Sequence, residues 1–264
     1  MITEIKSKDN KTYKAFTKLL NKKYRDQEGL FLIEECNLVK EAFDTGVSIR
    51  GLIVKKGCEN NIPDTIAQHL DDLHVYILDE SLYNNLCSSV SSRGIMAEVE
   101  KKDWTQEDFT GRGRNSGLVV LDRLQDPGNV GTIIRTADGA GIAGIICVKG
   151  TCDIYSPKTL RSSVGSIFRV PILFVDTDMQ AIDLCHSLGV KVAVSCFEGA
   201  CDYRQAPLGK ECAIVVGNEG QGVSDVFLDK ADIRVKIPMF GSLESLNASV
   251  AASLLMYEAA RKGW

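Results

Sequence analysis

The sequence has little of several residue patterns, and each shortage excludes a class of protein. Only three histidines occur among the 264 residues, and none stands at ligand spacing with another histidine or a cysteine. A metal centre is therefore not expected. No apolar run reaches the roughly eighteen residues that a transmembrane helix needs. The first four residues do not begin a signal peptide, so we expect none.

Cysteine pairs of the Cys-x-x-Cys type are also missing, although the chain has nine cysteines. Most of them lie in apolar, strand-like runs such as residues 145–148. Unpaired, buried thiols are typical of a reducing compartment, so we expect a cytoplasmic protein. The hydrophobic content of 44% and the net charge of −4 are typical of a globular protein that does not enter a membrane.

The first 25 residues are basic although the whole chain is acidic. Tyr13, Phe16 and Leu20 recur on one helical face and predict an amphipathic helix between residues 10 and 24. The other face carries Lys11, Lys14, Lys18 and Lys22. This face could be an ordinary solvated surface. Alternatively, it could bind nucleic-acid phosphates, since clustered cations gain affinity by releasing condensed counterions.

Two α/β domains are predicted on either side of a linker. In residues 1–105, helices are predicted over 38–44, 64–69 and 80–86, and strands over 49–54, 73–78 and 95–99. Residues 106–117 are charged and then glycine-rich, without apolar periodicity, and we interpret them as the linker. In residues 118–264, strands are predicted over 118–122, 145–148, 170–174, 190–195, 212–216 and 233–237. Helical segments between most of them predict a largely parallel sheet.

Loops at the strand ends of the second domain could carry chemistry, because ligands of open α/β sheets bind beyond the carboxyl ends of the strands. Residues 126–131 precede a helix predicted over 132–140 and leave Asn129 and Arg135 near that edge. Residues 217–222 have the glycine order G-x-x-G-x-G and no lysine, which argues against a nicotinamide fingerprint and a Walker loop.

A third loop, residues 238–247, joins the last strand to a C-terminal helix whose predicted N-cap is Ser245. Apolar residues recur along this helix at helical spacing, namely Leu246, Val250, Leu254 and Tyr257. Another helix is predicted to start at Ser156 and Pro157 and to carry Arg161.

The three loops together resemble one family. Their motifs are Leu121-Asp-x-x-x-Asp126-Pro-x-Asn129-x-Gly131-x-x-x-Arg135-Thr-Ala, Val216-Gly-x-Glu219-Gly-x-Gly222, and Ile237-Pro-Met-x-Gly-x-x-x-Ser245-Leu-Asn247-x-Ser249-Val-Ala. With these motifs the chain resembles RNA ribose 2′-O-methyltransferases of the SpoU (TrmH-like) branch of the SPOUT class. The N-terminal part resembles the small ribosomal-protein-like substrate-binding domain that often precedes this catalytic domain. Its usual Glu-Gly is Glu34-Glu35-Cys36 here, and a common Gln-Gly is Arg93-Gly94.

The resemblance implies a parallel-sheet domain with a deep trefoil knot, S-adenosylmethionine as cofactor, and a homodimer formed through the C-terminal domain. The implied cofactor-binding residues are Ser195, Val216, Gly217, Gly222, Ile237 and Leu246. The implied catalytic residues are Asn129, Arg135, Glu219, Ser245 and Asn247. For RNA binding we add Lys11, Lys14, Lys18, Lys22 and Arg161.

Methyl transfer needs an aligned ribose hydroxyl and a proton acceptor. The family proposal makes Arg135 the base, but a guanidinium costs roughly 7 kcal/mol to deprotonate at neutral pH. We therefore interpret Arg135 as a phosphate clamp and leave the base open. Asn129 and Asn247 are expected to hold Arg135 and the ribose in register. Ser245 is expected to bond near the reacting hydroxyl, and Glu219 to fix the loop or the arginine.

Other substrates and roles fit the same motifs. The catalytic motifs see only a ribose and a phosphate, so they allow transfer RNA as well as ribosomal RNA, and the extra N-terminal domain favours ribosomal RNA. A non-catalytic RNA-binding protein on the same scaffold would have lost a motif residue, and all five catalytic candidates are present. The modified nucleotide cannot be predicted from the sequence.

Overall fold

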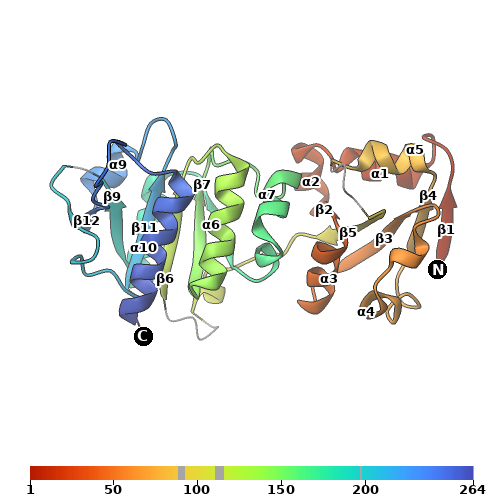
Figure 1. Ribbon diagram of the computed structural model, residues 1–264, viewed down its shortest axis with the longest axis horizontal. Helices are drawn as coiled ribbons and strands as arrows, with labels where there is room; N and C mark the ends of the chain where they lie inside the picture. Colours follow the sequence, from red (N-terminus) through yellow and green to blue (C-terminus); the bar gives the residue numbers. More distant parts are fainter. Residues whose placement is uncertain (89–92, 111–115, 197, 264) are drawn as a thin grey trace. The chain divides into compact units, whose positions relative to one another are not determined.

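The structure is a computed structural model that describes residues 1–88, 93–110, 116–196 and 198–263 (Figure 1). It forms two compact units. The N-terminal unit comprises residues 1–103 and 155–168, and the C-terminal unit comprises residues 104–154 and 169–264. Residues 155–168, which sequence analysis placed in the second domain, therefore pack with the first. Of the predicted linker, residues 111–115 lie outside the described residues.

The N-terminal unit is built on a mixed five-stranded sheet in the order β1-β4-β3-β5-β2. Its strands are β1 (Ile2–Ile5), β2 (Leu30–Glu34), β3 (Ile49–Lys55), β4 (Val75–Leu78) and β5 (Ile95–Glu100). β1, β4 and β3 run parallel, and β5 runs antiparallel to both β3 and β2. The predicted strands at β3, β4 and β5 are present, and β1 and β2 are additional.

The helices described with this sheet are α1 (Lys11–Lys18), α2 (Lys22–Glu28), α3 (Cys36–Asp44), α4 (Asp64–Ala67), α5 (Glu80–Leu86) and α7 (Pro157–Ser163). The helix predicted between residues 10 and 24 is interrupted at residues 19–21. Asn21 begins the second helix, because its side chain accepts a hydrogen bond from the Lys23 amide at 2.9 Å. The interruption shifts the register, so Leu19 is buried and Leu20 is 44% exposed.

The C-terminal unit is built on a seven-stranded sheet in the order β10-β12-β9-β11-β6-β7-β8, in which every pair is parallel. Its strands are β6 (Ser116–Asp122), β7 (Ile142–Val148), β8 (Ile172–Val175), β9 (Lys191–Ser195), β10 (Cys201–Asp202), β11 (Cys212–Gly217) and β12 (Ile233–Lys236). This confirms the predicted parallel α/β sheet. Because β12, β9, β11 and β6 are adjacent and parallel, their carboxyl ends meet at one edge.

Helices cover both faces of this sheet, and alternate residues of β6 serve the two faces. Leu118 and Val120 join the core cluster that contains Ile182 of α8 (Asp178–Ser187) and Phe227 of α9 (Asp225–Asp229). The opposite face is packed by α6 (Pro127–Gly139) and α10 (Ala248–Gly263), which contact each other and β6 or β7 (Figure 1).

The predicted linker also contributes to the core. Residues 106–109 form a short 3-10 helix, and Phe109 is buried in the cluster under α8. A Cβ on Gly144 of β7 would lie 2.3 Å from the Phe109 ring, so a glycine is needed there. Sequence analysis found no apolar periodicity in this segment, yet the structure buries its Phe109 in the core. No helix in the described ranges combines the length and apolar character needed to cross a membrane.

The C-terminal helix is present, but its start and its buried face differ from the prediction. Asn247, rather than Ser245, caps α10, since its Oδ1 accepts hydrogen bonds from the Ser249 amide at 2.9 Å and the Val250 amide at 3.3 Å. The face that packs against the sheet carries Ala252, Leu255, Met256 and Ala259. Val250, Leu254 and Tyr257 are 47%, 39% and 56% exposed, and they form an apolar stripe on the outer side of α10.

Candidate active site

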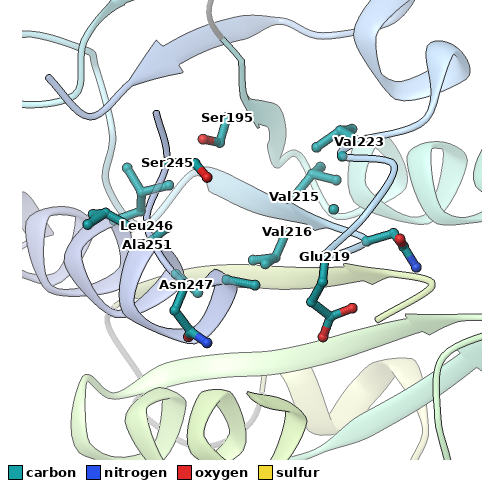
Figure 2. Close-up of a pocket in the computed structure, with 15 residues that line it drawn as sticks. Ser195, Val215, Val216, Glu219, Val223, Ser245, Leu246, Asn247 and Ala251 are labelled. Carbon is teal, nitrogen blue, oxygen red and sulfur yellow. The ribbon is translucent and has the colours of Figure 1, made fainter. Parts of the chain in front are cut away.

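A cavity of about 340 Å³ lies at the carboxyl edge of the C-terminal sheet (Figure 2). Ser195 at the end of β9 and Val215 and Val216 of β11 line it from the sheet. The rest of the lining comes from the loop after β11, from Ser245, Leu246 and Asn247, and from the first turns of α10. Of the predicted cofactor-binding residues, Ser195, Val216, Gly217, Gly222 and Leu246 line this cavity. Ile237 is half-buried and is not among the residues that line the cavity.

The glycine loop, residues 217–223, folds back tightly on the end of β11. A Cβ on Gly217 would lie 2.3 Å from backbone atoms of Gly222 and Val223, so no other residue fits there. Gly222 has φ +74°, which favours glycine. Asn218 ties the turn together, because its Oδ1 accepts hydrogen bonds from the Gly220 amide at 2.9 Å and the Gln221 amide at 3.0 Å.

Glu219 connects this loop to the loop before α6. One carboxylate oxygen accepts a hydrogen bond from the Gln125 amide at 2.9 Å. The other accepts from the Asp126 amide and from Asn129 Nδ2, both at 3.0 Å. A carboxylate only accepts hydrogen bonds, so the side chain of Asn129 must turn its amide nitrogen toward Glu219.

The orientation of Asn129 in turn determines that of Asn247. Asn129 Oδ1 accepts a hydrogen bond from Asn247 Nδ2 at 3.0 Å. Asn247 Oδ1 then faces the start of α10, where it caps the helix and accepts from the Ser249 hydroxyl at 2.7 Å. Three predicted catalytic residues thus form one polar chain, Glu219–Asn129–Asn247, with every amide orientation fixed. Asn129 is buried within it.

The charge state of Glu219 follows from the same contacts. Partial burial opposes ionisation, but hydrogen bonds from the Gln125 amide and Asn129 outweigh it and hold the pKa of Glu219 below its ordinary value. Glu219 is therefore an ionised anchor with its lone pairs committed to the protein. This arrangement favours the predicted role in fixing the loop.

Ser245 and Arg135 lie outside the polar chain. Ser245 lines the cavity, and Figure 2 shows its hydroxyl on the side of the cavity where Ser195 lies. Arg135 is exposed on α6, six residues beyond Asn129, which places it about 240° around the helix axis. In the described part of the chain no ion pair holds its guanidinium. In the described residues, no hydrogen bond or ion pair joins Arg135 to Asn129 or Asn247.

The predicted RNA-binding lysines are all exposed on α1 and α2. Lys14 pairs with Asp9 at 2.8 Å, and the Lys18 ammonium lies 5.6 Å from the centre of the Tyr24 ring. Arg161 differs from these lysines, because its guanidinium donates to the Ser88 hydroxyl at 2.6 Å and lies 3.9 Å from the buried carboxylate of Glu34. The structure therefore gives Arg161 a packing partner within the N-terminal unit.

Each of the two sequence departures in the N-terminal unit lies at or beside a residue with positive φ. Glu35 has φ +76° where the resembling domain has glycine, and Gly94 has φ +83°. A side chain in that region of φ costs of order 1–3 kcal/mol. At Glu35 the backbone therefore keeps the positive φ that glycine favours, and the side chain adds a carboxylate at this position.

Sequence reasoning missed several residues of the site. Asn218, Val215 and Val223 line the cavity, and only Asn218 has a local signal, since asparagine after a strand often bonds to the amides that follow it. Among the described residues, no three acidic, histidine or cysteine side chains gather as a metal site would require.

Comparisons with known proteins agree with this geometry. The SpoU rRNA Methylase family matches residues 116–257, and an MRM3-like substrate binding domain matches residues 10–97. The 23S rRNA (guanosine(2553)-2′-O)-methyltransferase RlmP of Bacillus subtilis is 34% identical over 254 residues, which cover 96% of this chain and 98% of that protein.

Solved structures extend the similarity to nearly the whole chain. The AdoMet-bound rRNA methyltransferase of Sinorhizobium meliloti is 30% identical with a TM-score of 0.85, over 99% of this chain and 98% of that one. The SpoU methyltransferase AviRb of Streptomyces viridochromogenes, in complex with AdoMet, is 28% identical with a TM-score of 0.84, over 96% of this chain and 98% of that one. The resemblance seen in the three loop motifs is thereby confirmed, and the chain belongs to the SpoU rRNA methylase family.

Proposed function

We propose that this protein is an S-adenosylmethionine-dependent RNA methyltransferase that methylates a ribose 2′-hydroxyl, with ribosomal RNA as the favoured substrate. The observation that carries the proposal is the polar chain Glu219–Asn129–Asn247, which joins residues of all three motif loops beside a cavity that the second and third loops line. The name of the Bacillus subtilis relative and the titles of the AdoMet-bound structures support the same reaction.

The residues around the cavity fit the cofactor. Val215, Val216 and Leu246 offer apolar walls, and the backbone of the glycine loop approaches closely because Gly217 and Gly222 have no side chains. The volume lies in the range of small-ligand pockets, about 300–1,000 Å³. When bound, S-adenosylmethionine supplies a methyl group on a sulfonium. The chain supplies orientation, because the hydrogen bonds already fix Asn129 and Asn247 and leave little to reorganise.

Arg135 suits the role of phosphate clamp. Its guanidinium is exposed and uncommitted, and its fork of donors matches a phosphate group. Its separation from the polar chain supports a site completed by a second subunit, with Arg135 of one chain acting beside Asn129 and Asn247 of another.

A homodimer through the C-terminal unit is supported by the apolar stripe on α10. Val250, Leu254 and Tyr257 are exposed, and the Tyr257 hydroxyl lies 3.3 Å from where a Cβ of Gly139 would be, one helical turn beyond Arg135 on α6. The stripe and Arg135 therefore share one side of the unit. Leu254→Glu should give a monomer in light scattering and lose methylation, whereas Leu243→Glu, an exposed leucine outside the stripe, should leave the assembly unchanged. A dimeric Leu254→Glu variant would move the interface elsewhere.

Further assignments complete the proposal. The family implies a trefoil knot in the C-terminal unit, and the N-terminal unit is assigned to RNA binding through Lys11, Lys14, Lys18 and Lys22. None of the nine cysteines forms a disulfide, which supports a cytoplasmic location.

Mapping of ribose methylation tests the proposal directly. Ribosomal and transfer RNA from cells with and without the gene should differ at one 2′-O-methylated ribose in ribosomal RNA, and purified protein should restore that mark with radiolabelled S-adenosylmethionine. A mark that is missing only in transfer RNA would select the alternative substrate. An unchanged pattern, together with no transfer in vitro, would leave a non-catalytic RNA-binding protein.

A further inference from the structure

Arg123 has a backbone conformation that non-glycine residues seldom adopt. It follows β6 directly and has φ +58°. In the described part of the chain only Glu35 and Val164 share a positive φ without being glycine. Such strain persists where the surrounding contacts over-determine it, and it concentrates at functional sites. We therefore examined which contacts hold Arg123 in this conformation and what they could do for the site.

The guanidinium of Arg123 joins two buried carboxylates. It contacts Asp122, which is 1% exposed, and one of its nitrogens lies 2.5 and 2.7 Å from the two carboxylate oxygens of Asp178 at the start of α8. Both aspartates also bind Ser224, the residue that follows the glycine loop. The Ser224 amide donates to Asp122 at 2.7 Å, and its hydroxyl donates to Asp178 at 3.1 Å.

The backbone carbonyl of Arg123 holds the other end of the glycine loop. It accepts hydrogen bonds from Asn218 Nδ2 at 2.8 Å and from Gln125 Nε2 at 2.9 Å. Asn218 then orders the amides of Gly220 and Gln221. Gly150 leaves room for this arrangement, since a Cβ there would lie 3.2 Å from the Arg123 side chain.

Arg123 thus reaches both ends of the loop that lines the cavity, through its carbonyl at Asn218 and through two aspartates at Ser224. None of the three sequence motifs names this residue as a functional one, and it does not line the cavity itself.

We propose that Arg123 is a positioning residue that holds the glycine loop in its cofactor-binding conformation from both ends. The inference rests on the proposed function, because it takes S-adenosylmethionine as the ligand of the cavity. Without the guanidinium, Asp122 and Asp178 repel each other and release Ser224, so the loop samples other conformations. If only a fraction of molecules has the competent loop, the apparent Kd rises by the inverse of that fraction.

Calorimetric titration of the purified chain with S-adenosylmethionine and with S-adenosylhomocysteine tests the proposal. Arg123→Ala should raise both Kd values by about tenfold or more while each titration still reaches full stoichiometry. Its KM for the cofactor should rise in parallel, and kcat at saturating cofactor should stay near the parent value. Mere loss of stability would instead lower the stoichiometry and kcat and leave Kd unchanged.

Arg169→Ala is the matched control. Arg169 makes a comparable ion pair in the same unit, with its Nε 2.7 Å from Asp138 and its side chain 35% exposed against 37% for Arg123. It should lower the melting temperature without changing either Kd. If Arg123→Ala does not fold, Arg123→Gly, which tolerates the positive φ, and Asp178→Asn, which keeps the side-chain shape, undergo the same titration.

The outcomes separate the two proposals. A Kd that is the same in the parent and in the folded Arg123 and Asp178 variants overturns the positioning role alone. A parent chain that binds neither ligand overturns the proposed function and this inference with it.

Discussion

The polar side chains of the two units differ in how far they are already bonded to the protein. In the C-terminal unit, Glu219, Asn129 and Asn247 form a continuous chain of hydrogen bonds. In the N-terminal unit, the lysines of α1 and α2 extend from an exposed helix surface. Fixed dipoles stabilise a reacting group because they need no reorganisation, whereas free cations can follow a phosphate backbone and displace its counterions. Under the proposed function, this difference separates the chemistry of the C-terminal unit from the attraction of RNA by the N-terminal unit.

The largest effect is expected at Arg135. It lies in the same unit as the hydrogen-bonded polar chain, but no ion pair in the described residues holds its guanidinium. If it clamps a phosphate in the transition state, Arg135→Ala should lower kcat/KM by about 10³-fold or more. Cofactor Kd and melting temperature should stay at parent values. Arg204→Ala, another exposed arginine of the same unit, serves as control. A variant that keeps most of its activity would remove Arg135 from the site.

Reversal of the lysine surface tests the other side of the comparison. Changing Lys11, Lys14, Lys18 and Lys22 to Glu should weaken RNA binding strongly and flatten its salt dependence, since each lost phosphate contact removes about 0.7–0.9 from the log–log slope. Cofactor Kd should not change. The control reverses four exposed lysines of the C-terminal unit, Lys149, Lys191, Lys210 and Lys230, with the same change of net charge. Equal losses in both variants would assign the effect to net charge alone.

Glu219 is already hydrogen-bonded to the protein, so changing it should weaken cofactor binding and leave RNA binding unchanged. In Glu219→Gln, one oxygen must serve the donors that two oxygens served, and the new amide nitrogen faces a donor. An unsatisfied donor costs about 1–3 kcal/mol, so cofactor affinity should fall about tenfold as the glycine loop loosens. RNA affinity should remain at the parent value. Glu211→Gln, which changes an exposed glutamate directly before β11, is the control. Weakened RNA binding with normal cofactor binding would contradict the comparison.

The sequence predicted the strands of the C-terminal sheet to within a few residues, because β6, β9 and β11 are continuous apolar runs buried on both faces. The short strands β1 and β10 were missed, since four and two residues carry too little periodicity. The start of α10 was misplaced because serine and asparagine are nearly equal as N-caps. Only the hydrogen bonds that Asn247 Oδ1 accepts from the Ser249 and Val250 amides show that Asn247, and not Ser245, lies at the helix start.

The burial of side chains and their long-range pairing could not be predicted from the local sequence pattern. Val250, Leu254 and Tyr257 have the spacing of a core face, yet they are exposed, because spacing defines a face and not its partner. The pairing of Arg123 with Asp178 joins positions 55 residues apart, and no motif connects them. The cavity could be predicted in outline from the second and third loops, since parallel strands bring their carboxyl ends to one edge.

The smallest expected effect is the dependence of stability on pH at Glu219. Its folded-state pKa lies below the ordinary value of 4.5, so the folded chain favours the carboxylate more than the unfolded chain does. The resulting stabilisation is fully present above pH 4.5 and is lost as the pH falls through the lowered pKa. Solvent screens this exposed residue, which limits the contribution to about 1 kcal/mol.

Other carboxylates titrate in the same range, among them Asp202, whose pKa Arg204 lowers to about 2. The informative quantity is therefore the difference in unfolding free energy between the parent and Glu219→Gln, measured by urea titration from neutral to acidic pH. That difference should shrink as the pH falls below 4.5. A Glu219→Gln difference that does not change with pH would mean that its hydrogen bonds do not depend on ionisation, and that the polar chain is held by shape rather than by charge.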